Sequence, residues 1–129
     1  TFSMLFDDRQ ISILAYNLET VLAEKLETVL SHNIANTRPR DYYDIHILYG
    51  LRGEECDKET LRQALERTTK KRGSGAILTD YMAILKEIRE SDTLRKLWEK
   101  YRREYDYAKD ISFEDTCNTV QEIMKAIIL

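Results

Sequence analysis

The segment Leu18-Glu-Thr-Val-Leu-Ala-Glu-Lys-Leu-Glu-Thr-Val-Leu30 decides the fold class of this chain. Its apolar residues recur at intervals of three and four, which places them on one side of an α-helix. Asn17 precedes the segment and is a residue type that caps helices. We therefore expect a helix over residues 18–33 and a helix-dominated fold.

The sequence after this segment continues the helical pattern. Pro39 suits the first position of a second helix, over 39–49, and Gly50 suits its C-terminal stop. Four more helices are predicted, namely 58–71 opened by Asp57, 79–90 opened by Thr79, 92–106 after Ser91 or Asp92, and 113–128 opened by Ser112 with Asp115 in a capping box.

The N-terminal residues have a different pattern from the rest. Two short apolar runs, 2–6 and 11–14, are separated by polar residues and predict a small β-hairpin or two edge strands. The predicted fold is therefore mainly α, a bundle of about six helices with a short N-terminal β-hairpin or edge strands.

Composition limits the class of protein. A chain of 129 residues with four Gly and one Pro suits one domain, 1–129, built from long helices. The net charge of −3 gives no general attraction to nucleic acid, so phosphate contacts must come from local patches. Cys56 and Cys117 form no metal-binding pattern, and no membrane span or signal peptide is visible. We expect a cytoplasmic protein without membrane contact.

Lys25 lies where the helical period calls for a hydrocarbon side chain. Glu19 falls on the same apolar arc, whereas Glu24 and Glu27 fall outside it. A half-buried lysine is costly unless a carboxylate or phosphate meets its ammonium group, so Lys25 should have a specific partner. A salt bridge to Glu19 or to an aspartate, or an aliphatic stem whose ammonium group reaches water, would be a purely structural explanation.

Two aspartates repeat this anomaly on the second predicted helix. Asp41 and Asp44 are three residues apart, so both lie on one otherwise apolar face. The helix dipole accounts for Asp41 in the first turn but not for Asp44. Arg38 and Arg40 could neutralise the pair or hold a phosphate. A lysine from one helix and these residues from the next predict a converging cluster that suits a triphosphate.

The literal sequence of this region resembles a known family. The segments 14–30, Ala35-Asn-Thr-Arg38 and Arg40-Asp-Tyr-Tyr-Asp-Ile45 are similar to the AbiEii/AbiGii toxin family of nucleotidyltransferase-like proteins. Members of this family place a Glu-Lys helix before an Arg-x-(Lys/Arg)-Asp-x-x-Asp segment. Trp98, Tyr101 and the segment 107–113 fit the family's C-terminal helices.

The resemblance implies a bacterial enzyme that transfers a nucleoside monophosphate from a nucleoside triphosphate (NTP), with Mg²⁺. Such an enzyme is the toxin of a type IV toxin–antitoxin or phage-defence pair, which implies a cognate antitoxin as partner. Some members use the 3′ end of transfer RNA (tRNA) as acceptor. The resemblance implies catalytic roles for Lys25, Asp41 and Asp44, with phosphate-binding support from Arg38 and Arg40.

Two motifs of the family's core are missing from the start of this chain. Neither the Gly-Ser motif nor the metal-binding Asp-x-Asp-like motif occurs before Lys25. We therefore expect residues 1–14 to be strands that continue a missing N-terminal core, and 15–129 to be the helical C-terminal half of a longer protein. This implies that the fragment alone holds no complete metal site, binds neither Mg²⁺ nor NTP, and is inactive.

Two alternatives to an enzyme remain. The helices could form a non-catalytic module that binds RNA or an antitoxin, or the buried charges could form an internal ion-pair network. The segment 95–107 mixes basic and aromatic residues, as in proteins that stack RNA bases. The spacing of Trp98, Tyr101 and Tyr105 nevertheless favours a stripe that faces the core.

Overall fold

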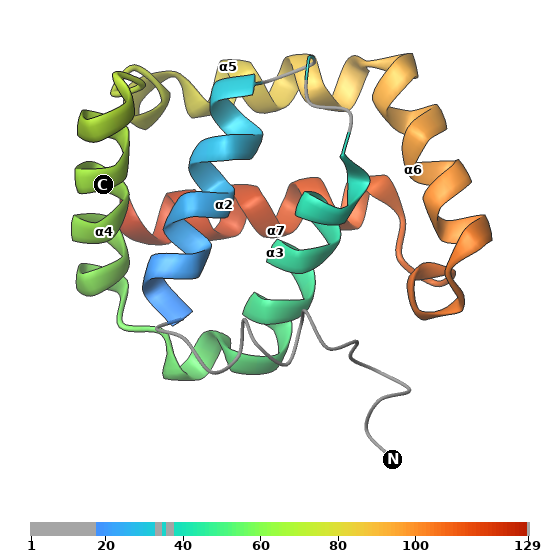
Figure 1. Cartoon of the computed structure of the whole chain (residues 1–129), viewed down its shortest axis with the longest axis horizontal. Helices are drawn as coiled ribbons and strands as arrows, with labels where there is room; N and C mark the ends of the chain where they lie inside the picture. Colours follow the sequence, from blue (N-terminus) through green and yellow to red (C-terminus); the bar gives the residue numbers. More distant parts are fainter. Residues whose placement is uncertain (1–17, 33–34, 36–37, 129) are drawn as a thin grey trace.

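The computed structural model of the chain describes residues 18–32, 35 and 38–128. Within these ranges the chain forms a bundle of α-helices joined by short connections and two 3-10 helices (Figure 1). The α-helices are α2 (Leu18–His32), α3 (Pro39–Arg52), α4 (Lys58–Arg72), α5 (Ile77–Glu90), α6 (Asp92–Glu104) and α7 (Phe113–Ile127), and the 3-10 helices are η3 (Gly53–Glu55) and η4 (Asp106–Ala108).

The C-terminal helix α7 crosses the bundle and is a packing partner of most of the other helices. It packs against α3, α4, α5 and α6, while α2 packs against α3, α4 and α5. In Figure 1, α2 and α3 run in opposite directions in front of α7, with α4 and α6 at the two ends of the molecule. The pair formed by α2 and α3 therefore lies at the centre of the bundle.

The core follows from the helical period of the sequence. On α7, the residues that point inward are Phe113, Thr116, Cys117, Val120, Ile123, Met124 and Ile127. They recur at intervals of three and four, so α7 presents one continuous apolar face. Trp98 of α6 is fully buried at one end of this face, and its indole N–H donates to the carbonyl oxygen of Ile111 at 2.9 Å.

The predicted fold class needs correction. A helical bundle fits the structure, but the part of the chain that the structure describes contains no strand or sheet. The apolar residues of each described segment recur at the helical period, and the helices bury them against one another. The runs expected to form a β-hairpin or edge strands, 2–6 and 11–14, lie outside the described residues, as does the predicted cap Asn17.

Helix boundaries differ from the prediction in α3 and α5, which are extended by a local turn, and in α6, which stops early. Gly50 does not end α3, which continues to Arg52 and then tightens into η3. Helix α5 begins at Ile77 and not at Thr79, because the amide of Ile77 already donates to the carbonyl oxygen of Ser74. Helix α6 ends at Glu104, two residues before the predicted end.

Other helix ends match their predicted chemistry. Pro39 occupies the first turn of α3, and Ser91 caps α6. Ser112 and Asp115 form the predicted capping box, since each side chain accepts from the other's backbone N–H. Asp57 precedes α4, but its side chain forms no capping hydrogen bond there.

Glu27 shows a second departure from the sequence pattern. It was expected outside the apolar arc of its helix, yet its side chain is only 5% exposed. The guanidinium group of Arg72 lies 2.5 Å from its carboxylate, and the hydroxyl of Ser74 donates to it at 2.8 Å. Burial alone would raise the pKa of Glu27, but hydrogen bonds from Arg72, Ser74 and Ser31 lower it below its ordinary value.

We expect Glu27→Gln to reduce the stability of the protein at neutral pH. The variant should then lose less stability than the wild type when the pH falls. The folded-state pKa of Glu27 lies below its ordinary value of 4.5. The contribution of ionised Glu27 to the free energy of unfolding is therefore complete above pH 4.5, and it is lost as the pH falls through the lower folded-state pKa. Urea unfolding from neutral to acid pH measures this effect.

Glu24→Gln is the matched control for this experiment. Glu24 also faces Arg72, at 3.7 Å, but its side chain is exposed. Its substitution should therefore leave the pH dependence almost unchanged. If the free energy of unfolding falls equally with decreasing pH in the wild type and in Glu27→Gln, ionised Glu27 does not stabilise the fold.

Tyr42 carries a buried hydroxyl group inside the core. Its ring is 1% exposed and meets Phe113 edge-on at a centroid distance of 5.4 Å. Among the described residues, no hydrogen-bond partner lies within reach of the hydroxyl oxygen. A buried hydroxyl without a partner costs about 1–3 kcal/mol, because it loses its hydration on folding.

Tyr42→Phe should therefore increase the free energy of unfolding, by about 1 kcal/mol. Chemical denaturation of the two proteins measures the difference. Tyr81→Phe, at a half-buried position on α5, is the control and should change stability little. A clear loss of stability in Tyr42→Phe would mean that the hydroxyl is hydrogen-bonded in the folded protein.

Candidate functional site

The charged residues singled out in the sequence converge between α2 and α3. The ammonium group of Lys25 lies 2.9 Å from a carboxylate oxygen of Asp44 and 3.4 Å from one of Asp41. Arg38 adds a second cation, with its Nε 3.4 Å from the other oxygen of Asp41. We call Lys25, Arg38, Asp41 and Asp44 the charged cluster. The expected specific partner of Lys25 is therefore a pair of aspartates.

Antiparallel packing of two helices creates this geometry. Lys25 lies midway along α2, and the two aspartates occupy the first turns of α3, which runs back beside it. The three-residue spacing of Asp41 and Asp44 directs both carboxylates toward α2. One ammonium group then meets both carboxylates.

Exposure within the charged cluster increases from the core to the surface. The side chains of Asp44 and Asp41 are 1% and 6% exposed, that of Lys25 is 20% exposed, and that of Arg38 is 71% exposed. Two positive and two negative charges balance one another. The carboxylates are therefore the buried part of the cluster, and Lys25 and Arg38 are the part that solvent reaches.

Glu19 has a different partner from the one considered for it in the sequence. It is buried, and its carboxylate accepts from the backbone N–H of Asp57 at 2.8 Å. This bond ties the start of α2 to the start of α4. Because it binds the backbone before α4 and not Lys25, its role is architectural.

Arg40 lies apart from the ion pairs of the charged cluster. It is half-buried, and its guanidinium group contacts the hydroxyl groups of Tyr101 and Tyr107. Burial lowers the pKa of Arg40, but these tyrosine contacts raise it above its ordinary value. The structure therefore brings Lys25, Arg38 and both aspartates together, and directs Arg40 toward Tyr101 of α6 and Tyr107 of η4.

A cluster of tyrosines beside Arg40 was not predicted as a unit. Tyr105 lies 4.8 Å from Tyr101 and 5.3 Å from Tyr107 by ring centroids, and Tyr43 lies 4.8 Å from Tyr107. The hydroxyl groups of Tyr101 and Tyr107 are 3.0 Å apart. Tyr101 is buried as expected, but Tyr105 is 36% exposed because α6 ends one residue before it.

A groove of about 360 Å³ runs between the start of α3 and helix α6. One wall includes Arg40 of α3 and Arg38, which directly precedes α3. The other wall includes Lys100 and Tyr101 of α6 and Tyr105, which directly follows α6. We call it the α3–α6 groove. Because Arg38 also belongs to the charged cluster, the groove and the cluster share a residue.

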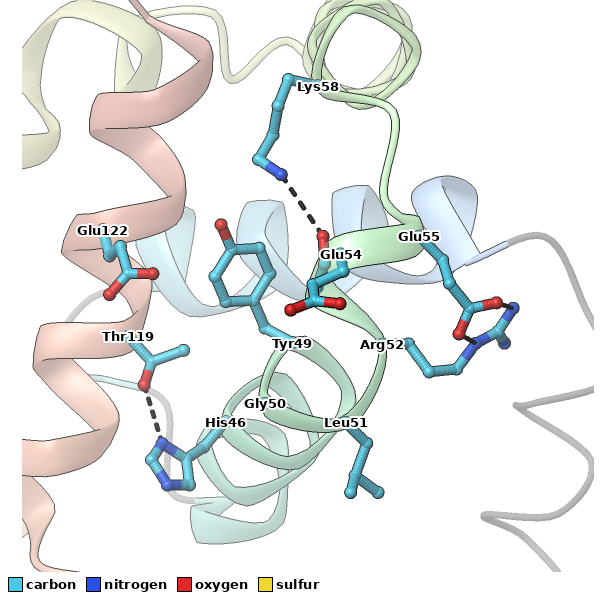
Figure 2. A pocket seen from close by; sticks show the side chains of 11 residues that line it. His46, Tyr49, Gly50, Leu51, Arg52, Glu54, Glu55, Lys58, Thr119 and Glu122 are labelled. Atoms are coloured by element: carbon cyan, nitrogen blue, oxygen red, sulfur yellow. Dashed lines mark hydrogen bonds and ion pairs between the residues drawn. The ribbon is translucent and has the colours of Figure 1, made fainter.

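A larger pocket of about 730 Å³ lies at the opposite end of α3, where this helix meets η3, α4 and α7 (Figure 2). Its cations already have partners. Lys58 lies over the ring of Tyr49 and donates to the carbonyl oxygen of Gly53, and Arg52 pairs with Glu55 at 3.3 Å. His46 bonds Thr119 at 2.7 Å, and burial lowers its pKa more than Asp115 raises it.

Within the described ranges, no group of three or more His, Cys, Asp or Glu side chains is arranged to hold a metal ion. Asp41 and Asp44 form a pair and not a set of three, and both carboxylates already contact Lys25. Cys56 and Cys117 are buried free thiols. None of the helices in this part of the chain is long and apolar enough to cross a membrane.

The stability of the charged cluster can be measured with Lys25→Met. This change leaves two buried carboxylates without their shared cation. Breaking a fully buried pair costs about 3–5 kcal/mol, and the partial exposure of Lys25 should reduce this cost. Adding Asp44→Asn should recover part of the loss, so a double-mutant cycle by urea unfolding should give a coupling energy of about 1 kcal/mol or more.

The exposed pair Arg62 and Glu66 on α4 provides the matched control. Its coupling energy should be about 0.5 kcal/mol or less, because both side chains contact water. Strictly additive effects of Lys25→Met and Asp44→Asn would show that the two residues do not interact in solution.

A comparison with known protein families identifies one family whose model matches this chain. The family model described as "Nucleotidyl transferase AbiEii toxin, Type IV TA system" matches residues 1–124. This match covers nearly the whole chain, including every residue of the cluster and of the α3–α6 groove. No curated protein and no solved structure gives a match.

Proposed function

The chain belongs to the family of AbiEii nucleotidyl transferase toxins of type IV toxin–antitoxin systems, and from this premise we propose that it takes part in transferring a nucleoside monophosphate from an NTP to an acceptor. The observation that carries the proposal is the charged cluster, in which two buried aspartates hold one lysine at the edge of the helix pair.

Burial divides the roles within the charged cluster. Asp44 and Asp41 are almost inaccessible, so we assign them as positioning residues that fix the ammonium group of Lys25. Lys25 retains some exposure, and its ammonium group is the part of the cluster that contacts a phosphate oxygen. Arg38 is the second cation on the same side, and its exposed guanidinium group can bind phosphate through two parallel hydrogen bonds.

Nucleotidyl transfer needs positive charge where the leaving group develops negative charge. In the proposed reaction, an acceptor hydroxyl oxygen attacks the α-phosphorus, and the bond from that phosphorus to the bridging oxygen breaks. Pyrophosphate leaves with the electron pair, and the hydroxyl proton passes to solvent. Lys25 and Arg38 stabilise the charge on the phosphates, and Lys25 is held in place by two buried carboxylates before the substrate binds.

Mg²⁺ accompanies NTP in this class of reaction and would neutralise phosphate charge. The described residues do not fit a magnesium site, since Asp41 and Asp44 are buried against Lys25 and no third ligand joins them. The proposed chemistry of this chain therefore rests on its two cations and on the aspartates that hold them.

The acceptor and the partner follow from the family premise. We propose an RNA acceptor, with the 3′ end of tRNA as the first to test. A cognate antitoxin is the protein partner that membership of a type IV toxin–antitoxin family implies. A role in defence against phage belongs to the same proposal.

Lys25→Ala should lower the rate of transfer about 100-fold or more, because loss of one preorganised charge at a phosphoryl group has an effect of this size. Transfer of labelled nucleotide to RNA, assayed in the full-length protein, measures the change. Circular dichroism at the assay temperature verifies that the variant remains folded. Lys25→Arg keeps the charge and should retain more activity than Lys25→Ala.

Lys86→Ala, at an exposed lysine on α5, is the control and should leave transfer unchanged. Full transfer activity in a folded Lys25→Ala variant would show that the charged cluster is an internal ion-pair network with a structural role only.

A further inference from the structure

We propose that the α3–α6 groove binds one unpaired nucleotide, with its base stacked on Tyr105 and its phosphate held by Lys100 and Arg38. This inference rests on the proposed function, since it assigns a binding site for a nucleotide that the reaction uses. Three properties of the groove support it, namely its aromatic wall, its charge and its position beside the charged cluster.

Tyr105 provides a fixed aromatic surface. Within the described part of the chain it is one of three large hydrophobic side chains that are exposed. Tyr107 stacks on its ring at 5.3 Å, and Tyr101 lies 4.8 Å away. Because these neighbours hold the ring, it loses little freedom when a ligand stacks on it. Every nucleobase has a π-face, so such a ring can bind a base of any sequence.

The charge of the groove favours a phosphate. Three of its wall residues are cations, Arg38, Arg40 and Lys100, whereas Glu104 is the one acid among the residues that line it. This local excess of positive charge contrasts with the net charge of −3 for the whole chain. Lys100 is exposed, and its flexible ammonium group can follow a phosphate.

The size and position of the groove match a single nucleotide. Its volume of about 360 Å³ lies near the lower end of the range for small-molecule sites, roughly 300–1,000 Å³. Arg38 lines the groove and also contacts Asp41 at 3.4 Å. A phosphate bound by Arg38 would therefore lie next to the charged cluster. Base and phosphate could come from a free NTP or from the 3′ end of a single-stranded RNA.

The larger pocket of Figure 2 fits a nucleotide less well. Three glutamates, Glu54, Glu55 and Glu122, line it. Its two strong cations, Arg52 and Lys58, are already bound to a carboxylate and to backbone carbonyl oxygens. The balance of charge there disfavours a phosphate.

The test measures binding of two probes to the full-length protein, a fluorescein-labelled single-stranded RNA and a fluorescent ATP analogue. Tyr105→Ala should weaken binding about tenfold, because it removes the stacking surface. Tyr105→Phe keeps the ring and should bind like the wild type. Lys100→Ala should weaken RNA binding and lower the salt dependence by about one phosphate contact. Lys125→Ala, at an exposed lysine on α7, is the charge control and should have no effect.

The two probes identify the source of the nucleotide. Weaker RNA binding alone in Tyr105→Ala assigns the groove to the acceptor end, and weaker binding of the ATP analogue alone assigns it to the donor. Unchanged binding of both probes in Tyr105→Ala, or failure of the wild type to bind either probe, overturns the inference.

The transfer assay separates this inference from the proposed function. Unchanged probe binding in Tyr105→Ala, combined with loss of transfer in Lys25→Ala, removes the groove assignment alone. Probe binding that depends on Tyr105, combined with full transfer in Lys25→Ala, removes the proposed function and leaves the groove as a nucleotide-binding site.

Discussion

Two carboxylates share one ammonium group at the edge of the helix pair, and this contact constrains the relative position of α2 and α3. A buried carboxylate is strongly disfavoured without a cation, so Asp41 and Asp44 can be buried only where Lys25 reaches them. Such a contact restricts how far the two helices can slide or rotate against each other. The same requirement that fixes their register also holds a lysine at the surface in a defined position, which is the property that binding an anion needs.

The parts of this structure that follow local rules were predictable from sequence. The apolar period of residues 18–30 gives α2, and the Ser112 and Asp115 pair gives the start of α7, because both depend on residues close in the chain. The need of Lys25 for a partner was also predictable, since an amphipathic pattern reveals a charge on the apolar side. The identity of that partner required the packing of α2 against α3.

The departures arise where distant residues decide the outcome. Glu27 is buried because Arg72, 45 residues away in sequence, reaches it, and a helical projection of α2 contains no information about α4. Tyr105 is exposed because α6 ends earlier than its aromatic spacing suggests. The exposed aromatic surface of the α3–α6 groove therefore results from the position at which α6 ends. The spacing of Trp98, Tyr101 and Tyr105 in the sequence had instead favoured a buried, core-facing stripe.

Arg38 is the residue common to the charged cluster and the α3–α6 groove. In the complex proposed above, an Arg38 guanidinium group turned toward the bound phosphate would withdraw charge from Asp41, and Lys25 would then be the main cation left to balance the two aspartates. Occupancy of the groove and the strength of the lysine–aspartate contact would then be linked thermodynamically, and such a linkage acts equally in both directions. A single surface arginine would thus couple binding in the groove to the ion pairs between α2 and α3.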